Sequence, residues 1–563
     1  MSNAVSLAEQ QLQQAVLDAV KKAVAAGELP EAKLAPVTVE IPGDRAHGDL
    51  ATNAAMSSAR AFRLPPRRIA DAILAHLQLE NTYLERAEVA GPGFLNLFLS
   101  PAFYAASVGE VLAQGDTFGR SDFGGGKKVM VEFVSANPTG PMHMGNARGG
   151  ALGDCLAAVL DAAGYDVWRE FYINDAGNQI EKFGLSLDIR YQQLFLGDKA
   201  PELPEDAYHG DDIRVHAQGY AALHGDSLLE VSEEERRKAL VAYALPLNID
   251  KMQRDLKKYR IVYDQWFHES VLHNSGEVKE VIDLLTEKGL TYEKDGALWY
   301  KASENGGEKD EVLVRANGNP TYFAADIAYH RNKFRRGFDT CIDVWGADHH
   351  GHVARMKGAM DAIGLDGDQL QVVLIQLVRL MRDGEVVRMS KRSGKAIQLA
   401  DLLDEVPVDA ARFFFNLREA NTRMDFDLDL AVEQSASNPV YYVQYAHARI
   451  CSIFKNLAAD GISPRDCTRD ELCLLTEPEE KELIRYLAGY PGEIVAAAKT
   501  YDPARMTRYC MELATLFHKF YNACRVKGED EPLMQARLSL CAATRHTLKN
   551  ALTLLKIDAP ESM

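Results

Sequence analysis

Two segments far apart in the chain carry side chains that suit a nucleotide phosphate. Residues 129–134 are a mostly apolar, β-branched run that predicts a buried strand, and the Asn-Pro-Thr-Gly-Pro turn at 137–141 excludes helix. Apolar residues at spacings of three and four then predict a helix over 147–163. His143 and Gly145 therefore lie at a helix N-terminus, where free N–H groups and a partial positive charge favour phosphate. His143 can donate to a phosphate oxygen, and Gly145 lets a flat base approach the backbone.

The second segment is the basic run at residues 386–395, which includes Ser390 and Lys391 and follows a predicted hairpin at 377–387. Neither segment is a P-loop or a dinucleotide fingerprint, because the chain lacks G-x-x-x-x-G-K-S/T and has no G-x-G-x-x-G after a strand. Side chains and a helix start, rather than a glycine-rich cradle, must then hold a phosphate. Taken alone, the basic run also fits a solvated loop.

Carboxylates that could receive a cationic ligand stand in two places. Tyr322 and Asp326 occupy positions i and i+4 of a predicted helix that Thr321 would cap, so a phenol and a carboxylate share one helix face. Glu269 comes just after another predicted strand. A guanidinium has only donors and pairs best with a planar carboxylate in a bidentate arrangement. The alternative for each carboxylate is an exposed residue at a helix start.

A histidine-rich cluster at residues 345–352 raises the possibility of a metal site. Its spacing matches no known zinc arrangement, so we predict no metal. The strand that ends at Gly346 brings Asp348 and His349 to the ligand crevice, where a contact to adenosine or to an amino acid is the better interpretation.

The two phosphate segments together resemble the paired signatures of class I aminoacyl-tRNA synthetases. Residues 143–146, His-Met-Gly-Asn, resemble the HIGH sequence, and residues 388–392, Arg-Met-Ser-Lys-Arg, resemble KMSKS. More closely, the run at 135–148 is similar to the arginyl-tRNA synthetase family, and the similarity extends over essentially the whole chain.

The resemblance implies an enzyme that joins L-arginine to ATP, with Mg²⁺, and passes the arginyl group to the 3′ end of tRNA(Arg). The implied catalytic residues are His143, Asn146, Ser390 and Lys391. The implied ATP contacts are His143, Gly145, Asn146, Asp348, His349, Met389 and Lys391. The implied arginine contacts are Ser135, Asn137, Glu269, Tyr322 and Asp326. The implied tRNA contacts, on a helix whose aromatic and basic side chains suit unstacked bases, are Asn438, Tyr441, Tyr442, Tyr445 and Arg449.

This sequence departs from the family pattern at a few positions. Asn146 stands where the first signature has a second histidine, and its amide can still donate to phosphate. Arg388 and Arg392 replace the first lysine and the last serine of the second signature, so positive charge is kept and we expect activity. Phe171 stands where many members have tyrosine, and we interpret residues 166–177 as scaffold.

Composition excludes several other classes of protein. The 63 basic and 81 acidic residues give a net charge of −18, which argues only weakly against nucleic acid because a local basic surface decides binding. There is no apolar run long enough for a membrane span, and no secretory signal pattern. The eight scattered cysteines form no C-x-x-C, so we expect reduced thiols in a cytoplasmic protein.

The patterning predicts an α/β protein of three parts. Residues 1–114 form a small α/β domain, which in the resembled family touches the tRNA elbow. Residues 115–404 follow a Gly-rich linker and alternate strands with helices, which predicts a doubly wound, Rossmann-like parallel sheet with a helical insertion at about 178–260. Residues 405–563 form an all-α bundle without strands, which in the resembled family binds the anticodon. Individual predictions are strands at 37–41 and 94–99 and helices at 65–77, 409–417, 431–458, 479–498, 503–524 and 532–555.

Three alternatives stay open at this point. A class I synthetase for cysteine would want a zinc–thiolate set, yet only Cys155 and Cys341 lie in the catalytic part; glutamine is a further alternative substrate. A non-catalytic tRNA-binding paralogue predicts loss of His143 or Lys391, and both are present. A nucleotidyltransferase acting on small molecules leaves the two outer domains without a purpose. The absence of a repeat or a coiled-coil seam favours a monomer.

Overall fold

The computed structural model describes residues 4–387, 397–528 and 530–563. At its centre lies a five-stranded sheet in the order β11-β10-β4-β5-β6, in which every pair of neighbours is parallel. Its strands are β4 (Lys128–Glu132), β5 (Asp166–Ile173), β6 (Gln265–His268), β10 (Thr340–Gly346) and β11 (Leu370–Ile375). The predicted doubly wound sheet is confirmed, and the strand order reverses direction between β4 and β10, which is where ligands of such sheets bind.

Strand β4 shows why both faces of the sheet are covered. Val129 and Val131 pack in one core with helix α5 (Met144–Ala162), whereas Met130 belongs to a second core on the opposite face. The second core contains residues of α11 (Tyr322–Arg335) and α12 (His350–Ile363). Helix α5 lies very close to the chain after β4, because a Cβ at Gly153 would fall 2.3 Å from the Phe133 ring.

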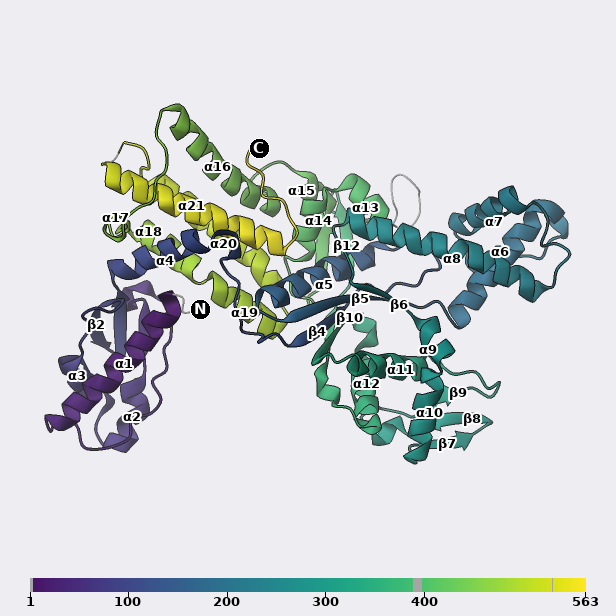
Figure 1. Ribbon diagram of the computed structural model, residues 1–563, viewed down its shortest axis with the longest axis horizontal. Helices are drawn as coiled ribbons and strands as arrows, with labels where there is room; N and C mark the ends of the chain where they lie inside the picture. Colours follow the sequence, from purple (N-terminus) through teal and green to yellow (C-terminus); the bar gives the residue numbers. More distant parts are fainter. Residues whose placement is uncertain (1–3, 388–396, 529) are drawn as a thin grey trace.

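The insertion between β5 and β6 is helical, as predicted, and projects away from the sheet (Figure 1). It consists of α6 (Asn178–Leu196), α7 (Asp211–His224) and α8 (Glu233–Lys258). Its own small core includes Phe183, Leu187, Tyr191, Ile213 and Leu240. The insertion therefore packs as a separate arm.

Between β6 and β10 lies a compact α/β region around the second core. Its elements are α9 (Glu269–Ser275), α10 (Glu277–Glu287) and an antiparallel sheet of β7 (Thr291–Lys294), β8 (Ala297–Tyr300) and β9 (Glu311–Val314). After β11, the predicted hairpin is confirmed as β12 (Val378–Arg382) and β13 (Glu385–Val387).

The N-terminal module combines α1 (Ala4–Ala25), α2 (Ala54–Phe62) and α3 (Pro66–His76) with an antiparallel sheet in the order β1-β3-β2. Strand β3 (Phe94–Leu99) was predicted, and β2 (Leu84–Ala90) was not. The strand predicted at 37–41 is wrong: Ile41 is 66% exposed, and only Glu40 makes an isolated bridge, to Ala51. The edge strand is instead β1 (Leu50–Thr52), whose three residues are all buried and so lack an alternating pattern.

The C-terminal region is mostly helical, with three corrections. The helix predicted at 431–458 is not helical over residues 433–438, and the long helix begins at Pro439. Strand β14 (Met424–Asp427) pairs in parallel with β12, so strands do occur beyond residue 405. The helix predicted at 479–498 is two helices, because the chain turns at Gly489. The elements are α13 (Leu399–Glu405), α14 (Val408–Phe415), α15 (Leu428–Val432), α16 (Pro439–Ala459), α17 (Arg469–Leu472), α18 (Pro478–Ala488), α19 (Tyr490–Thr500), α20 (Ala504–Ala523) and α21 (Glu531–Leu554).

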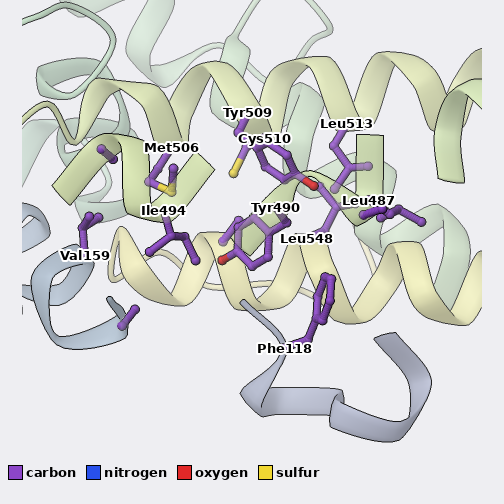
Figure 2. Close-up of a cluster of buried hydrophobic side chains, with 14 of the residues drawn as sticks. Phe118, Val159, Leu487, Tyr490, Ile494, Met506, Tyr509, Cys510, Leu513 and Leu548 are labelled. Carbon is purple, nitrogen blue, oxygen red and sulfur yellow. The ribbon is translucent and has the colours of Figure 1, made fainter. Parts of the chain in front are cut away.

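The C-terminal helices pack against helix α5, which covers the five-stranded sheet. Figure 2 shows the junction, where Val159 of α5, Phe118 of the linker and Tyr490 of α19 lie among side chains of the C-terminal helices. The ring centroids of Phe118 and Tyr490 are 5.9 Å apart. Helix α4 (Pro101–Gln114) packs against α17, α18 and α21. In the described ranges, no helix combines the length and apolarity that a membrane crossing needs.

Candidate active site

A cavity of about 430 Å³ opens at the carboxyl ends of β4 and β10, beside the N-terminal half of α11. Its lining includes four of the residues that the sequence predicted for the site, from three different segments: Ser135, Asn137, Asp326 and His349. A larger neighbouring cavity, of about 930 Å³, shares Ser135, Asn137 and His349 with it. The two cavities therefore meet at these residues.

The backbone between β4 and the Asn-Pro turn is strained at the edge of the cavity. Val134 and Ser135 have φ values of 73° and 42°, which non-glycine residues and above all β-branched ones avoid. The Ser135 hydroxyl donates to Glu132 Oε1 at 2.7 Å and accepts from the Tyr172 backbone N–H at 3.1 Å. These bonds hold the strained segment in one conformation.

A buried ion network lies beneath Ser135. The Lys333 ammonium of α11, fully buried, donates to Glu132 and, at 2.8 Å, to Asp343 of β10. His330 Nε2 lies 2.7 Å from the other oxygen of Asp343. Burial alone would raise the pKa of Asp343, but the Lys333 charge and the His330 contact outweigh it and lower this pKa to about 2. Helix α11 is thereby joined to β4 and β10 by charged groups.

Two carboxylates face the same buried phenol. Glu269, the first residue of α9, is nearly fully buried, and Asp326 has 35% of its side chain exposed. Burial, together with the charges of Glu269 and Asp326, raises the pKa of Tyr172 far above its usual value. Burial also raises the pKa of Glu269, and the Asp326 charge adds to this. Two carboxylates whose charges act on the same phenol favour a cationic ligand near them.

The Glu269 carboxylate lines a third cavity, of about 300 Å³, together with Tyr322. Tyr322 and Asp326 do lie in the first turns of α11, but they line neighbouring cavities. Asn174 donates to Glu269 Oε2 at 3.1 Å when its amide is oriented to satisfy its neighbours. Thr321 is the N-cap residue of α11, as predicted, but its hydroxyl donates to Val312 O instead of capping the helix.

The helix N-terminus of the first signature borders the 930 Å³ cavity. His143 is the exposed N-cap residue of α5, and both His143 and Asn146 line the 930 Å³ cavity. Asn146 Oδ1 accepts from the His143 backbone N–H at 3.0 Å, so the amide NH₂ is the part of Asn146 left for a ligand. A Cβ added to Gly145 would meet no atom within 4 Å among the described residues, apart from its own stretch of helix. The opening therefore offers donors and a flat backbone face.

The second signature lies outside the described residues, and with it Met389, Ser390 and Lys391. The chain that follows it is bonded to the first signature. Met144 N–H donates to Ile397 O at 3.1 Å, and Leu399 N–H donates to Met142 O at 3.0 Å. Residues 397–399, just after the second signature, therefore pair with the first signature.

His349 and Asp348 lie in the turn after β10. His349 lines both of the larger cavities, whereas the Asp348 side chain is 83% exposed and lies at a smaller cavity behind them. Among the described residues, no group of three or more His, Cys, Asp or Glu side chains could hold a metal ion.

Comparison with known proteins decides the family. Residues 10–99 match the arginyl tRNA synthetase N terminal domain, residues 107–454 the catalytic domain of tRNA synthetases class I (R), and residues 443–563 the DALR anticodon binding domain. The chain is 55% identical to an arginine--tRNA ligase of Acetivibrio thermocellus and 56% identical to one of Ruminiclostridium cellulolyticum, each over 100% of both chains. The chain belongs to the arginyl-tRNA synthetase family.

A solved structure agrees with this fold. The Thermus thermophilus arginyl-tRNA synthetase superposes with a TM-score of 0.72 over 99% of this chain and 100% of that one, at 23% identity. The predicted arginyl-tRNA synthetase resemblance and the class I fold are therefore confirmed. The chain is an enzyme of this family, and membership of the class implies use of ATP.

The residues expected to touch tRNA lie on or just before α16. Tyr445 and Arg449 fall within the part that matches the DALR domain, which begins at residue 443. Tyr445 is 42% exposed, Tyr441 and Tyr442 are half-buried, and the Arg449 guanidinium lies 4.8 Å from the Tyr521 ring centroid. Asn438 is different: it is buried, caps α16 by accepting from Val440 N–H, and donates to Glu433 O. We therefore leave Asn438 out of the surface proposed for tRNA.

Several residues of the site escaped prediction. Tyr172 and Asn174, in and after β5, line the 430 Å³ cavity although their segment was interpreted as scaffold. His352 also lines this cavity, and Lys333 lies in the buried ion network beneath it. The one available signal was position, because residues just after a parallel strand lie at the ligand edge of the sheet.

Proposed function

We propose that this protein activates L-arginine with ATP and transfers the arginyl group to the 3′ end of tRNA(Arg). The observation that carries the proposal is the pair of carboxylates, Glu269 and Asp326, whose charges both raise the pKa of Tyr172 at the ligand edge of a class I sheet. Two carboxylates suit a guanidinium, which has five donors and no acceptor.

In this proposal, the arginine side chain lies toward Asp326, Glu269 and Tyr322, and its α-amino and carboxylate groups lie toward Ser135 and Asn137. The buried Glu269 supports this, because a buried carboxylate is costly unless a cation pairs with it. Lysine would bring a point charge that cannot bond two carboxylates in a planar fork, which would cost about 4 kcal/mol or more. Selection by binding alone then suffices.

The ATP is proposed to lie in the 930 Å³ cavity, with its phosphates near His143 and Asn146 and its adenosine near Gly145, Asp348 and His349. Met389, Ser390 and Lys391 remain predicted contacts from the sequence. Mg²⁺ is proposed to accompany ATP. The described residues offer no acidic cluster to hold it, which fits an ion carried mainly by the phosphates themselves.

The proposed chemistry needs no protein nucleophile. An arginine carboxylate oxygen attacks the α-phosphorus as the bond to the β-phosphate breaks, and pyrophosphate leaves; a ribose hydroxyl of tRNA then attacks the arginyl carbonyl, and AMP leaves. His143 would stabilise charge on the phosphoryl oxygens, and the pocket would hold the carboxylate in line. Alignment and charge stabilisation are therefore the work of the protein.

For tRNA, the proposed contacts are Tyr441, Tyr442, Tyr445 and Arg449, to which His518 is added because its ring lies 5.3 Å from that of Tyr442. The division into residues 1–114, 115–404 and 405–563 is part of the proposal. The monomeric state and the cytoplasmic location remain predictions.

Two assays with each of the twenty amino acids test the proposal. ATP–pyrophosphate exchange is measured with and without tRNA, and charging is measured with tRNA. We expect arginine alone to support charging. Exchange or charging driven by another amino acid would overturn the assignment. Arginine-driven exchange without charging would overturn the transfer step and support the activation step alone.

A further inference from the structure

A chain of three side chains reaches Asp326 from behind the arginine pocket. His352 of α12 brings Nε2 to 3.2 Å from Asp326 Oδ2, within reach of a hydrogen bond. On the other side of the same ring, Arg355 brings Nε to 3.1 Å and a terminal nitrogen to 2.7 Å from His352 Nδ1. Arg355 is itself paired with Glu311 of β9. The order is therefore Glu311, Arg355, His352, Asp326.

The chemistry of the chain sets the tautomer of His352. A guanidinium has donors only, so both contacts from Arg355 require a lone pair on Nδ1. The ring proton must then lie on Nε2, the nitrogen that faces Asp326. Arg355 thus turns His352 into a hydrogen-bond donor to the carboxylate, and Glu311 compensates the charge of Arg355.

The ring of His352 is also held on its faces. Its centroid lies 5.3 Å from that of Trp345 and 5.9 Å from that of Phe323, and the Arg355 guanidinium lies 5.6 Å from the Phe323 ring. The His352 side chain is only 15% exposed. Packing of this kind leaves the imidazole little freedom, so its donor has a defined direction.

We propose that His352 and Arg355 are positioning residues that hold the Asp326 carboxylate in the orientation needed to receive the substrate guanidinium. His352 occupies Oδ2 from the α12 side and leaves Oδ1 directed to the substrate. This inference rests on the proposed function, because it assigns Asp326 to arginine. No role in binding ATP follows for either residue.

The test compares variants that keep or lose the donor. His352→Gln retains an N–H at about the place of Nε2, and His352→Leu removes it. Arg355→Lys retains a cation and a donor, and Arg355→Met removes both. Lys357→Met, which changes a cation of the same helix that pairs with Asp368 instead, is the control. Thermal melting of each variant verifies folding, and KM for arginine, KM for ATP and kcat are measured by charging of tRNA.

We expect His352→Leu to raise KM for arginine about tenfold, as loss of a hydrogen bond to a charged group should, and to leave KM for ATP within about twofold. Arg355→Met should have a smaller effect in the same direction. His352→Gln, Arg355→Lys and the control should stay within about threefold of wild type. The double variant His352→Leu/Arg355→Met should resemble His352→Leu alone, because Arg355 acts only through His352.

An unchanged KM for arginine in His352→Leu would overturn the inference, as would an equal rise in KM for ATP or a double variant in which the two effects multiply. Should His352→Leu fail to fold, the comparison of Arg355→Met with Arg355→Lys decides in its place, and equal values for these two would overturn it. A wild-type enzyme that charges no arginine would refute the proposed function instead, so the two failures are distinguishable.

Discussion

Lys333 offers the most demanding test of the pocket floor, because one buried ammonium serves two buried carboxylates. The Lys333 side chain is 0% exposed, as is that of Asp343, and the Glu132 side chain is 9% exposed. Lys333→Met keeps most of the aliphatic stem and removes the charge. It leaves Glu132 and Asp343 buried without their cation, which should cost about 3–5 kcal/mol of the free energy of unfolding near pH 7.

The dependence on pH gives this prediction its sharpest feature. In the wild type, Asp343 has a folded-state pKa of about 2 against an ordinary value of 3.8, so its contribution to stability is complete above 3.8 and is lost only as pH falls toward 2. In Lys333→Met, burial without the cation raises the pKa of Asp343, and it raises the pKa of Glu132 further than burial already does in the wild type. They take up protons in the folded state as the pH falls, so the variant gains stability relative to the wild type between about pH 7 and about pH 5.

The assay is urea denaturation followed by tryptophan fluorescence. All four tryptophans lie between residues 168 and 345, so the signal reports on the catalytic part. Lys279→Met is the matched control, because Lys279 pairs with Asp283 on the exposed side of α10 and should change stability by no more than about 1 kcal/mol. Two results would refute the reasoning. One is a loss of unfolding free energy in Lys333→Met as small as in the control. The other is a difference in unfolding free energy between variant and wild type that is the same at about pH 7 and about pH 5.

Three further predictions address the site and its support. Asp326→Asn should lower kcat/KM for arginine about a thousandfold or more while KM for ATP stays near wild type, measured by tRNA charging across substrate concentrations. His143→Ala should lower kcat about a hundredfold, in pre-steady-state formation of the adenylate, and leave the melting temperature unchanged because the side chain is exposed. Arg412→Met, which removes a fully buried guanidinium, should cost about 3–5 kcal/mol in urea denaturation.

The parts of the fold that the sequence predicted are those with strong local signals. The apolar run of β4 and the periodic helices α3 and α20 show in their own sequences which face is buried, and the Pro/Gly turn after β4 excludes helix. The edge strand β1 was not predicted, because it is a strand through its pairing with β3 and its own three residues show no alternation. In β14, the alternation of buried and exposed residues was present in only four residues, too few to separate from a loop.

The site divides in the same way. Glu269 and His349 were predicted from their positions after strands of a parallel sheet, whose carboxyl ends lie at one edge, whereas Ser135 and Asn137 were predicted from the family resemblance. Lys333 was missed because a lysine followed by Arg335 and Arg336 at the end of a helix is typical of a solvated basic turn. Its partners lie in β4 and β10, so only the folded sheet brings the charges together.

Helix α5 connects the reaction centre to the part of the chain proposed to recognise tRNA. Its first turn carries His143, and further along Arg148, buried, donates to the main-chain oxygens of Gln376, Glu419 and Thr422 at 2.8–2.9 Å. One turn and a half later, Asp154 accepts from the buried Arg412 at 2.6 Å. Burial lowers the pKa of Arg148 to about 10, which still leaves it charged at neutral pH.

Arg412 completes this connection, because the same guanidinium also donates to Leu555 O at the end of α21 and to Tyr259 O after α8. One charged side chain thus joins the catalytic helix, the root of the insertion and the last helix of the C-terminal region. Buried ion pairs of this kind contribute little net stability but are strongly penalised when a partner moves, which favours a single relative arrangement of the parts they join. The tRNA surface proposed on α16 and the phosphate site proposed at the start of α5 are therefore held in one relative arrangement by these buried charges.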